Sequence, residues 1–161
     1  MPANIHPACE TGDIAMSHTH FLFHIVFATK DRRLLIANEW ESELHAYISG
    51  IIKNHGGQTL EIGGMPDHLH IATQLDLKAG FPDLMRDVKA SSSRWVRQNR
   101  LREFSWQRRY GAFTISESAL EPVRRYIRNQ KSHHLGQSFE DEYRSLLRKH
   151  RIAFEDEYLW A

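Results

Sequence analysis

The stretch GGMPDHLHIAT, residues 63–73, combines the residues of a tight turn with those of a strand. Glycine, proline and aspartate favour the turn, and the alternating residues that follow favour the strand. Because successive side chains of a strand point to opposite faces, His68 and His70 share one face, with Cα atoms roughly 6–7 Å apart, while Leu69 and Ile71 face the core. Two imidazoles in this arrangement can bind one metal ion.

The histidine pair does not identify a metal site by itself. The chain has 11 histidines and a second pair with the same spacing, His18-Thr19-His20. A short pattern in a histidine-rich chain therefore carries a high risk of chance occurrence. The alternative interpretation is an ordinary polar strand face, and other parts of the chain must decide between the two.

Length and composition indicate one globular domain of 161 residues, with 41% hydrophobic and 25% charged residues. The single cysteine, Cys9, excludes an internal disulfide framework and a cysteine-based zinc cluster. No apolar run suits a signal peptide or a membrane span, so we expect a cytoplasmic protein. We expect residues 1–16 to be a poorly ordered extension, with Met16 as an alternative start, and residues 17–161 to form the domain.

Charge is unevenly distributed along the chain. The net charge is only +1, but residues 86–131 contain 12 Lys/Arg against 4 Asp/Glu, whereas residues 1–85 contain 5 against 10. A basic block of this kind is typical of a protein that binds a phosphate backbone. The alternative is a solvated helix face.

The remaining segments alternate between strand and helix patterns. Apolar, aromatic and β-branched residues predict strands at 20–29, 58–62, 69–75 and 111–115. Apolar residues at helical spacing predict helices at 38–55, 81–100, about 118–134 and about 138–150. This order predicts an α+β, ferredoxin-like (RRM-like) βαββαβ sandwich with a four-stranded antiparallel sheet and added C-terminal helices.

The predicted helix at about 118–134 presents a second group of functional side chains. Tyr126 and Gln130 are four residues apart and therefore lie on one helical face, among arginines and lysines. A phenol, an amide oxygen, a metal and cations are suited to covalent phosphoryl transfer. The alternative is that Tyr126 is an ordinary tyrosine at the edge of the core.

Several short motifs resemble one known family. They are FATK (27–30), GMPDHLHI (64–71), SSSRW (91–95), WQ (106–107), YGAF (110–113) and YIRNQK (126–131). In their order and spacing they resemble the HUH superfamily, and within it the single-tyrosine transposases of small bacterial insertion sequences and their relatives, the REP-associated tyrosine transposases. The resemblance extends from about residue 17 to residue 160.

This resemblance implies a role for each matched residue. His68, His70 and Gln130 would be metal ligands for Mg²⁺ or Mn²⁺, and Tyr126 would be the nucleophile. The enzyme would cleave and rejoin single-stranded DNA at ends marked by imperfect hairpins, through a 5′-phosphotyrosine intermediate. The family also implies a homodimer, in which the tyrosine helix completes the histidine site of its own subunit or of the other.

The basic helices are the predicted DNA-contacting surface. The candidate residues for backbone contacts are Lys30, Arg86, Lys89, Arg94, Arg97, Arg124, Arg125, Arg128 and Lys131. Trp95, Trp106 and Tyr110 are candidates for stacking on bases, with core packing as the alternative for Trp95.

Other functions remain open on the sequence. A domesticated or non-catalytic hairpin-binding protein would share the fold and the basic surface. A replication initiator or relaxase would share the chemistry. A hydrolytic metalloenzyme would use His18, His20 and His24, and in the transposase interpretation His133 or His134 would be alternative ligands to Gln130.

Overall fold

The computed structural model describes residues 18–133 and 136–160. The predicted residues 1–16 lie outside the described part of the chain. The α+β fold contains β1 (Phe21–Ala28), α1 (Asn38–Asn54), β2 (Gln58–Met65), β3 (His68–Leu75), α2 (Phe81–Asn99) and β4 (Gly111–Thr114). It continues through α3 (Glu117–Arg128), α4 (Gln130–His133), α5 (Phe139–Lys149) and α6 (Asp156–Leu159). Among the described residues, no helix is long and apolar enough to cross a membrane.

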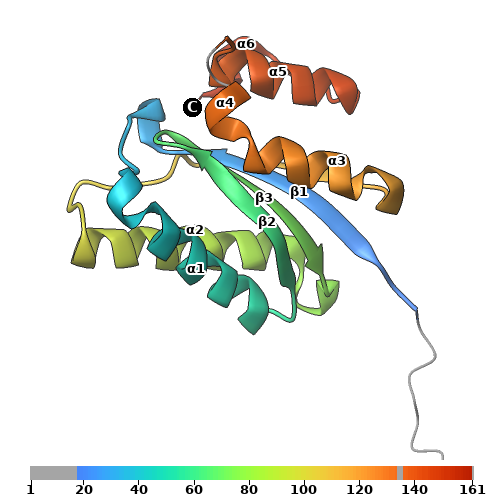
Figure 1. The fold of residues 1–161 in the computed structure, drawn as a ribbon, viewed down its shortest axis with the longest axis horizontal. Helices are drawn as coiled ribbons and strands as arrows, with labels where there is room; N and C mark the ends of the chain where they lie inside the picture. Colours follow the sequence, from blue (N-terminus) through green and yellow to red (C-terminus); the bar gives the residue numbers. More distant parts are fainter. Residues whose placement is uncertain (1–17, 134–135, 161) are drawn as a thin grey trace, which may run out of the picture.

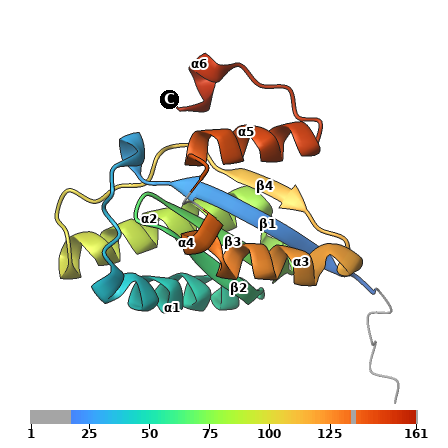
Figure 2. The same ribbon diagram turned by 45° about the horizontal axis from the view of Figure 1, so that its top comes forward.

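The four strands form one antiparallel sheet in the order β2-β3-β1-β4, as a ferredoxin-like fold requires. The sheet separates two helical layers, with α1 and α2 on one face and α3 to α6 on the other (Figures 1 and 2). β1 lies between β3 and β4. This central position explains the nearly continuous apolar sequence of β1, because both of its faces are covered.

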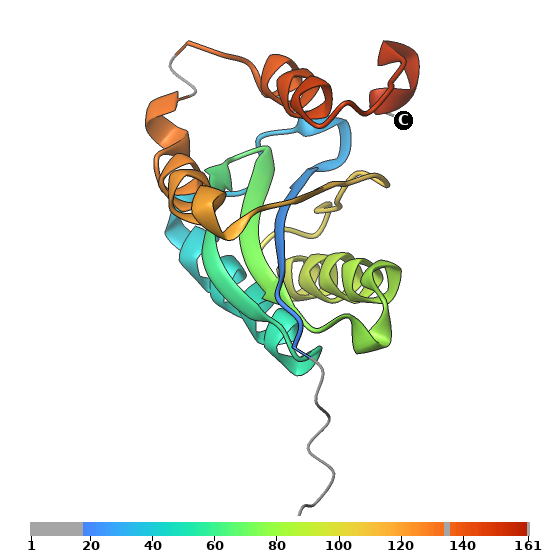
Figure 3. The same cartoon turned by 90° about the vertical axis from the view of Figure 1, so that its right-hand side faces the viewer.

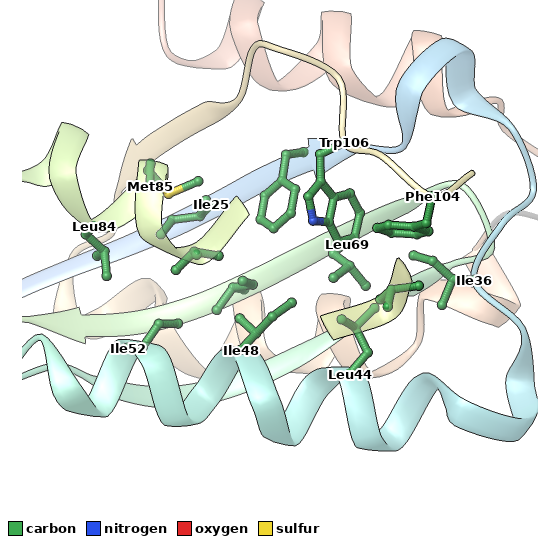
Figure 4. Packing of buried hydrophobic residues seen from close by; sticks show 14 of the residues in the cluster. Ile25, Ile36, Leu44, Ile48, Ile52, Leu69, Leu84, Met85, Phe104 and Trp106 are labelled. Atoms are coloured by element: carbon green, nitrogen blue, oxygen red, sulfur yellow. The ribbon is translucent and has the colours of Figure 1, made fainter. Parts of the chain in front are cut away.

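The main hydrophobic core lies between the sheet and α1 and α2 (Figure 4). Ile25 and Phe27 of β1 and Leu69 and Ile71 of β3 point into it, and each is at most 1% exposed. The residues of β3 that alternate with them therefore face the other layer. These residues include His68 and His70, so the histidine pair lies under α3 to α6.

A second, smaller core holds the C-terminal helices on this other face. Phe139, Tyr143 and Leu147 of α5 pack against Val26 of β1 and Phe113 of β4. α3 instead lies over β2 and β3. Figure 3 shows α3 and α5 as separate helices on this face of the sheet. The two helices therefore approach the histidine pair from different sides.

Two predicted boundaries differ from the structure. Gly63 and Gly64 lie within β2 and not in the turn, which is limited to Pro66 and Asp67. The predicted helix at about 118–134 is divided, because α3 ends at Arg128 and α4 begins after Asn129, whose backbone lies outside the helical range (φ −97°, ψ 17°). The residues of the motif YIRNQK (126–131) therefore belong to two consecutive helices.

Gly63 and Gly64 of β2 instead allow neighbouring backbone segments to approach this strand closely. A Cβ atom at Gly63 would lie 2.7 Å from the backbone oxygen of Ile127 in α3, and one at Gly64 would lie 2.1 Å from the backbone oxygen of His68. Both neighbours are backbone atoms, so a change of rotamer cannot relieve either contact. The lack of a side chain at Gly63 thus permits α3 to lie directly on β2.

We expect Gly63→Ala to lower the free energy of unfolding by about 1–3 kcal/mol, because α3 must move away from β2. Gly50→Ala is the matched control. It lies in α1 with no atom within 4 Å of the added methyl group, and should raise the stability by about 0.5–1 kcal/mol. Urea denaturation of both variants measures the difference. Equal stability of Gly63→Ala and the unaltered protein would contradict the role assigned to Gly63.

Candidate active site

Two imidazoles and one carboxylate converge between the sheet, α3 and α5. His68 and His70 of β3 are buried, and Glu142 of α5 reaches both of them. The Nε2 atom of His68 lies 3.6 Å from one carboxylate oxygen of Glu142, and that of His70 lies 3.4 Å from the other. One potential ligand atom from each of the three residues lies within 4.8 Å of the others. This group has the composition of a metal-binding site.

Neighbouring side chains orient both imidazoles. The Nδ1 atom of His68 donates a hydrogen bond to Asp67 Oδ1 over 2.7 Å, which leaves the Nε2 lone pair directed toward Glu142. The Nδ1 atom of His70 is hydrogen-bonded to His24 Nε2 at 2.9 Å. Partners of this kind fix the ring orientation and tautomer of metal-ligating histidines. Both Nε2 atoms are thereby presented to the same carboxylate.

Gln130 joins the histidine pair to Glu142. Its Oε1 atom lies 3.4 Å from His68 Nε2, and its Nε2 atom donates a hydrogen bond to Glu142 Oε1 over 3.0 Å. Gln130 is 1% exposed. The division of the helix at Asn129 therefore does not prevent Gln130 from reaching the predicted site.

The donor set fits a divalent metal ion. His68 Nε2, Gln130 Oε1 and the Glu142 carboxylate are all lone-pair donors that face one another. A cation between such atoms relieves their mutual repulsion. Imidazole combined with oxygen ligands suits Mn²⁺ better than Mg²⁺, which prefers oxygen ligands alone.

Tyr126 lies beside this group in the same chain. Its ring meets the His70 ring edge-on, with centroids 5.7 Å apart, and the His24 ring at 6.1 Å. Tyr126 is partly exposed, whereas both histidines are buried. A phenol at the border between the solvent and the candidate metal site is in a position from which it can meet a large substrate.

Burial changes the protonation of two members of the site. Burial raises the pKa of Glu142 to about 7, although the electrostatic interaction with the neighbouring His68 acts in the opposite direction. Burial, together with the charges of His70 and His150, lowers the pKa of His24 well below its usual value. His24 is therefore neutral at pH 7, and Glu142 is close to half-protonated there in the metal-free protein.

We expect Glu142→Gln to stabilise the metal-free protein at pH 8. The folded-state pKa of about 7 exceeds the usual value of 4.5, so the folded protein loses stability as the pH rises from about 4.5 to 7. Removing the ionisable group should recover up to about 3 kcal/mol at pH 8 and very little at pH 4. Urea denaturation at both pH values in EDTA measures this difference.

The same substitution should weaken Mn²⁺ binding, so its effects on stability and on metal affinity have opposite signs. Titration calorimetry measures the affinity. Glu157→Gln is the matched control, since Glu157 is exposed on α6, and should change neither quantity. A Glu142→Gln variant that keeps both the pH dependence and the Mn²⁺ affinity would contradict the role of Glu142.

No sequence motif pointed to Glu142, and His24 was predicted only as part of an alternative site. A signal for Glu142 was present, because it lies three residues after Phe139 and beside Tyr143 on the apolar face of α5. A charged residue at a buried helical position is a candidate functional group. His24 similarly interrupts the apolar sequence of β1.

The alternative site of His18, His20 and His24 does not form within the described part of the chain. His20 is paired with Glu117 at 2.7 Å and is half-exposed, while His24 is buried against His70. Among residues 18–133 and 136–160, the one group with metal-site geometry is that of His68, His70 and Glu142. The alternative ligand His134 lies outside the described residues, and the side chain of His133 is not described.

The predicted DNA-contacting residues of α2 lie on the face of the sheet opposite to the candidate active site (Figure 1). Arg94 is exposed, and Arg86 is exposed but paired with Asp83. Lys89 donates hydrogen bonds to the backbone oxygens of residues 107, 108 and 109, and burial lowers its pKa to about 8. Arg97 donates to the backbone oxygen of Phe104. Lys89 and Arg97 thus hold the segment before β4.

The predicted contacts of α3 and α4 lie on the same side of the sheet as the site. Arg124 and Arg128 are paired with Glu61 of β2, and Lys131 is paired with Glu41 of α1. Arg125 is exposed. These ion pairs connect the tyrosine-bearing helix α3 to β2, and α4 to α1.

Lys30 and the three predicted stacking residues also have defined positions. Lys30 is exposed in a short 3-10 helix after β1. Trp106 is 8% exposed, packs edge-on against Phe27 and belongs to the core, a position that favours a packing role over stacking on bases. Trp95 is half-buried and stacks on Tyr47, whereas Tyr110 is half-buried beside Lys89.

Comparisons with known proteins agree with this fold. A family model described as "Transposase IS200 like" matches residues 17–130. The ISDra2 transposase TnpA of Deinococcus radiodurans is 24% identical over 115 residues, which cover 67% of this chain and 82% of that protein. A solved transposase structure from the same organism has a TM-score of 0.59 at 22% identity, and covers 71% of this chain and 94% of its own.

A second solved structure shares the fold. It is a REP-associated tyrosine transposase bound to a REP hairpin, with a TM-score of 0.57 at 16% identity. The match covers 71% of this chain and 68% of the other.

Proposed function

Since this chain belongs to the IS200-like transposase family, whose members are enzymes that cleave and transfer DNA strands, we propose that it acts through Tyr126 on single-stranded DNA. The proposed substrate is DNA whose ends are marked by imperfect hairpins. The proposed product is a covalent 5′-phosphotyrosine intermediate. His68, His70 and Glu142, together with Gln130, are the proposed ligands of a divalent metal ion.

The observation that carries this proposal is the position of Tyr126 against the candidate metal site. The ring lies 5.7 Å from the His70 ring, and the Nε2 atom of His70 faces Glu142. A nucleophile beside a cation-binding group is the arrangement required for attack on a phosphodiester. A tyrosine with only a packing role would not need this partly exposed position.

In the proposed reaction, the phenolic oxygen of Tyr126 attacks the phosphorus atom of the DNA backbone. The bond between this oxygen and phosphorus forms while the bond from phosphorus to the 3′ oxygen breaks. The phenolic proton is released, and the departing 3′ oxygen takes up a proton. The resulting phosphotyrosine is still a phosphodiester, so the 3′-OH of another strand can reverse the attack without ATP.

The remaining residues hold the reacting groups in place. Asp67 and His24 orient the two histidines, and the ion pairs of Arg124 and Arg128 with Glu61 hold α3 against β2. When bound, Mn²⁺ or Mg²⁺ would polarise the scissile phosphate and neutralise developing negative charge. Exposed cations such as Arg125 are proposed contacts for the DNA backbone.

One further part of the proposal comes from a relative of known structure. A hairpin is bound in the solved structure of the REP-associated transposase, and we propose the same kind of DNA for this chain. A homodimer is also proposed. Tyr126 lies beside His70 of the same chain, and we propose that each site is assembled within one subunit.

Incubation of the purified protein with single-stranded DNA from the regions that flank its gene, in Mn²⁺, tests the function. We expect an adduct that survives denaturing electrophoresis and that mass spectrometry locates on Tyr126. DNA binding without an adduct in either Mn²⁺ or Mg²⁺ would instead favour the non-catalytic hairpin-binding protein. A replication initiator or relaxase would form the adduct on DNA from a replication or transfer origin.

A further inference from the structure

A pocket of about 490 Å³ opens beside Tyr126, between α3 and α5. It is lined by Ala119 and Val123 of α3 and by Ser145 and Leu146 of α5, and also by Tyr126 and Glu142. The pocket is therefore continuous with the candidate active site. None of the residues assigned above to DNA contacts lines it.

The residues that α3 and α5 contribute to the pocket follow helical spacing. Ala119, Val123 and Tyr126 are spaced by four and three residues, as are Glu142, Leu146 and Lys149 on the other helix. Residues at these intervals lie along one side of an α-helix. The result is a groove between two helices that is lined by both apolar and polar side chains.

The dimensions and chemistry of the pocket suit one nucleoside. Pockets for single small molecules are typically about 300–1,000 Å³, with mainly apolar walls and a few polar groups. Ala119, Val123 and Leu146 provide the apolar walls, while Thr114 and Ser145 provide hydroxyl groups. A planar base fits between such walls, and the hydroxyl groups can hydrogen-bond to its edge.

We propose that this pocket binds the nucleoside on the 3′ side of the cleaved bond, which stays joined to Tyr126 through its 5′ phosphate. This inference rests on the proposed function. In an in-line displacement the departing 3′ oxygen lies on the far side of phosphorus from the attacking oxygen. The retained 5′ oxygen lies in the equatorial plane and stays bound to phosphorus, so a pocket lined by Tyr126 can hold the nucleoside that remains attached to this residue.

The position of Lys149 supports a path of the DNA strand that leads out of the pocket. It lines the pocket and is exposed, so its ammonium group lies at the rim. A strand whose first nucleoside occupies the pocket must leave through this rim, and its next phosphate would meet the cation there. The pocket would then contribute to the choice of cleavage site through the identity of one base.

Binding of nucleoside monophosphates to the intact protein in Mn²⁺ tests this inference, with titration calorimetry as the readout. The probes are the 5′- and 3′-monophosphates of the four deoxynucleosides. We expect at least one 5′-monophosphate to bind about five-fold or more tightly than its 3′ isomer. Ala119→Trp, which fills the pocket, should weaken this binding about ten-fold or more, whereas Ala46→Trp, on the exposed face of α1, should not.

Absence of binding, preference for the 3′ isomers, or unchanged binding in Ala119→Trp would overturn the inference. If Ala119→Trp does not fold, Ser145→Trp fills the same pocket from α5. Failure here is separable from failure of the proposed function. An adduct on Tyr126 that forms equally well in the filled variant would refute the pocket alone, while nucleotide binding without any adduct would refute the phosphotyrosine reaction alone.

Discussion

Tyr126→Phe is expected to abolish the covalent adduct with single-stranded DNA, a loss of at least about a thousand-fold in the rate of adduct formation. The substitution removes only the phenolic oxygen and leaves the ring that packs against His24 and His70. The fold and the affinity for hairpin DNA should therefore be retained. Denaturing electrophoresis measures the adduct, and a gel-shift assay measures the affinity.

Tyr47→Phe is the matched control for this experiment. Tyr47 stacks on Trp95 in the opposite helical layer and is 38% exposed, so loss of its hydroxyl group should not change adduct formation. An adduct that persists in Tyr126→Phe would show that another residue is the nucleophile. Loss of DNA binding together with the adduct would instead show that the hydroxyl group has a binding role.

His68→Ala and His70→Ala are each expected to weaken Mn²⁺ binding by at least about a hundred-fold, because each removes one of the few ligands to the ion. Adduct formation should fall with the metal affinity. Titration calorimetry measures the affinity of each variant. His55→Ala is the control, since His55 is paired with Asp87 of α2, on the far side of the sheet from the proposed metal site.

The histidine variants also test how the site is assembled. In this structure Tyr126 and the histidine pair come from one chain. A mixture of Tyr126→Phe with the double variant His68→Ala, His70→Ala should therefore remain inactive. Recovery of the adduct in the mixture would show that the tyrosine helix of one subunit completes the site of another. Unchanged Mn²⁺ affinity in both single variants would contradict the metal assignment itself.

The order of strands and helices was predictable because it depends on local periodicity. The alternation in β3 placed Leu69 and Ile71 in the core and the two histidines on the other face, and the structure confirms this arrangement. The same order of elements gave the ferredoxin-like sheet, which the structure and the matched folds confirm. Such patterns repeat every two or 3.6 residues and can be recognised without knowledge of the fold.

The position of the basic residues was not predictable in this way. The block at residues 86–131 is continuous in the sequence, but the chain crosses from one helical layer to the other between α2 and α3. Its cations are therefore divided between opposite faces of the sheet. Several of them, including Lys89 and Arg128, already hold neighbouring parts of the protein.

The sequence by itself determined that His68 and His70 share one strand face, that Tyr126 lies on a helix, and in which order strands and helices follow along the chain, because each of these depends on residues that are close along the chain. Only the tertiary structure decided that Glu142 joins the two histidines and that α3 lies on Gly63. Glu142 is 72 residues from His70, so no local pattern connects them. Contacts over such separations are set by the packing of whole helices on the sheet, through which α5 buries Phe139 and Tyr143 and carries Glu142 to the histidines.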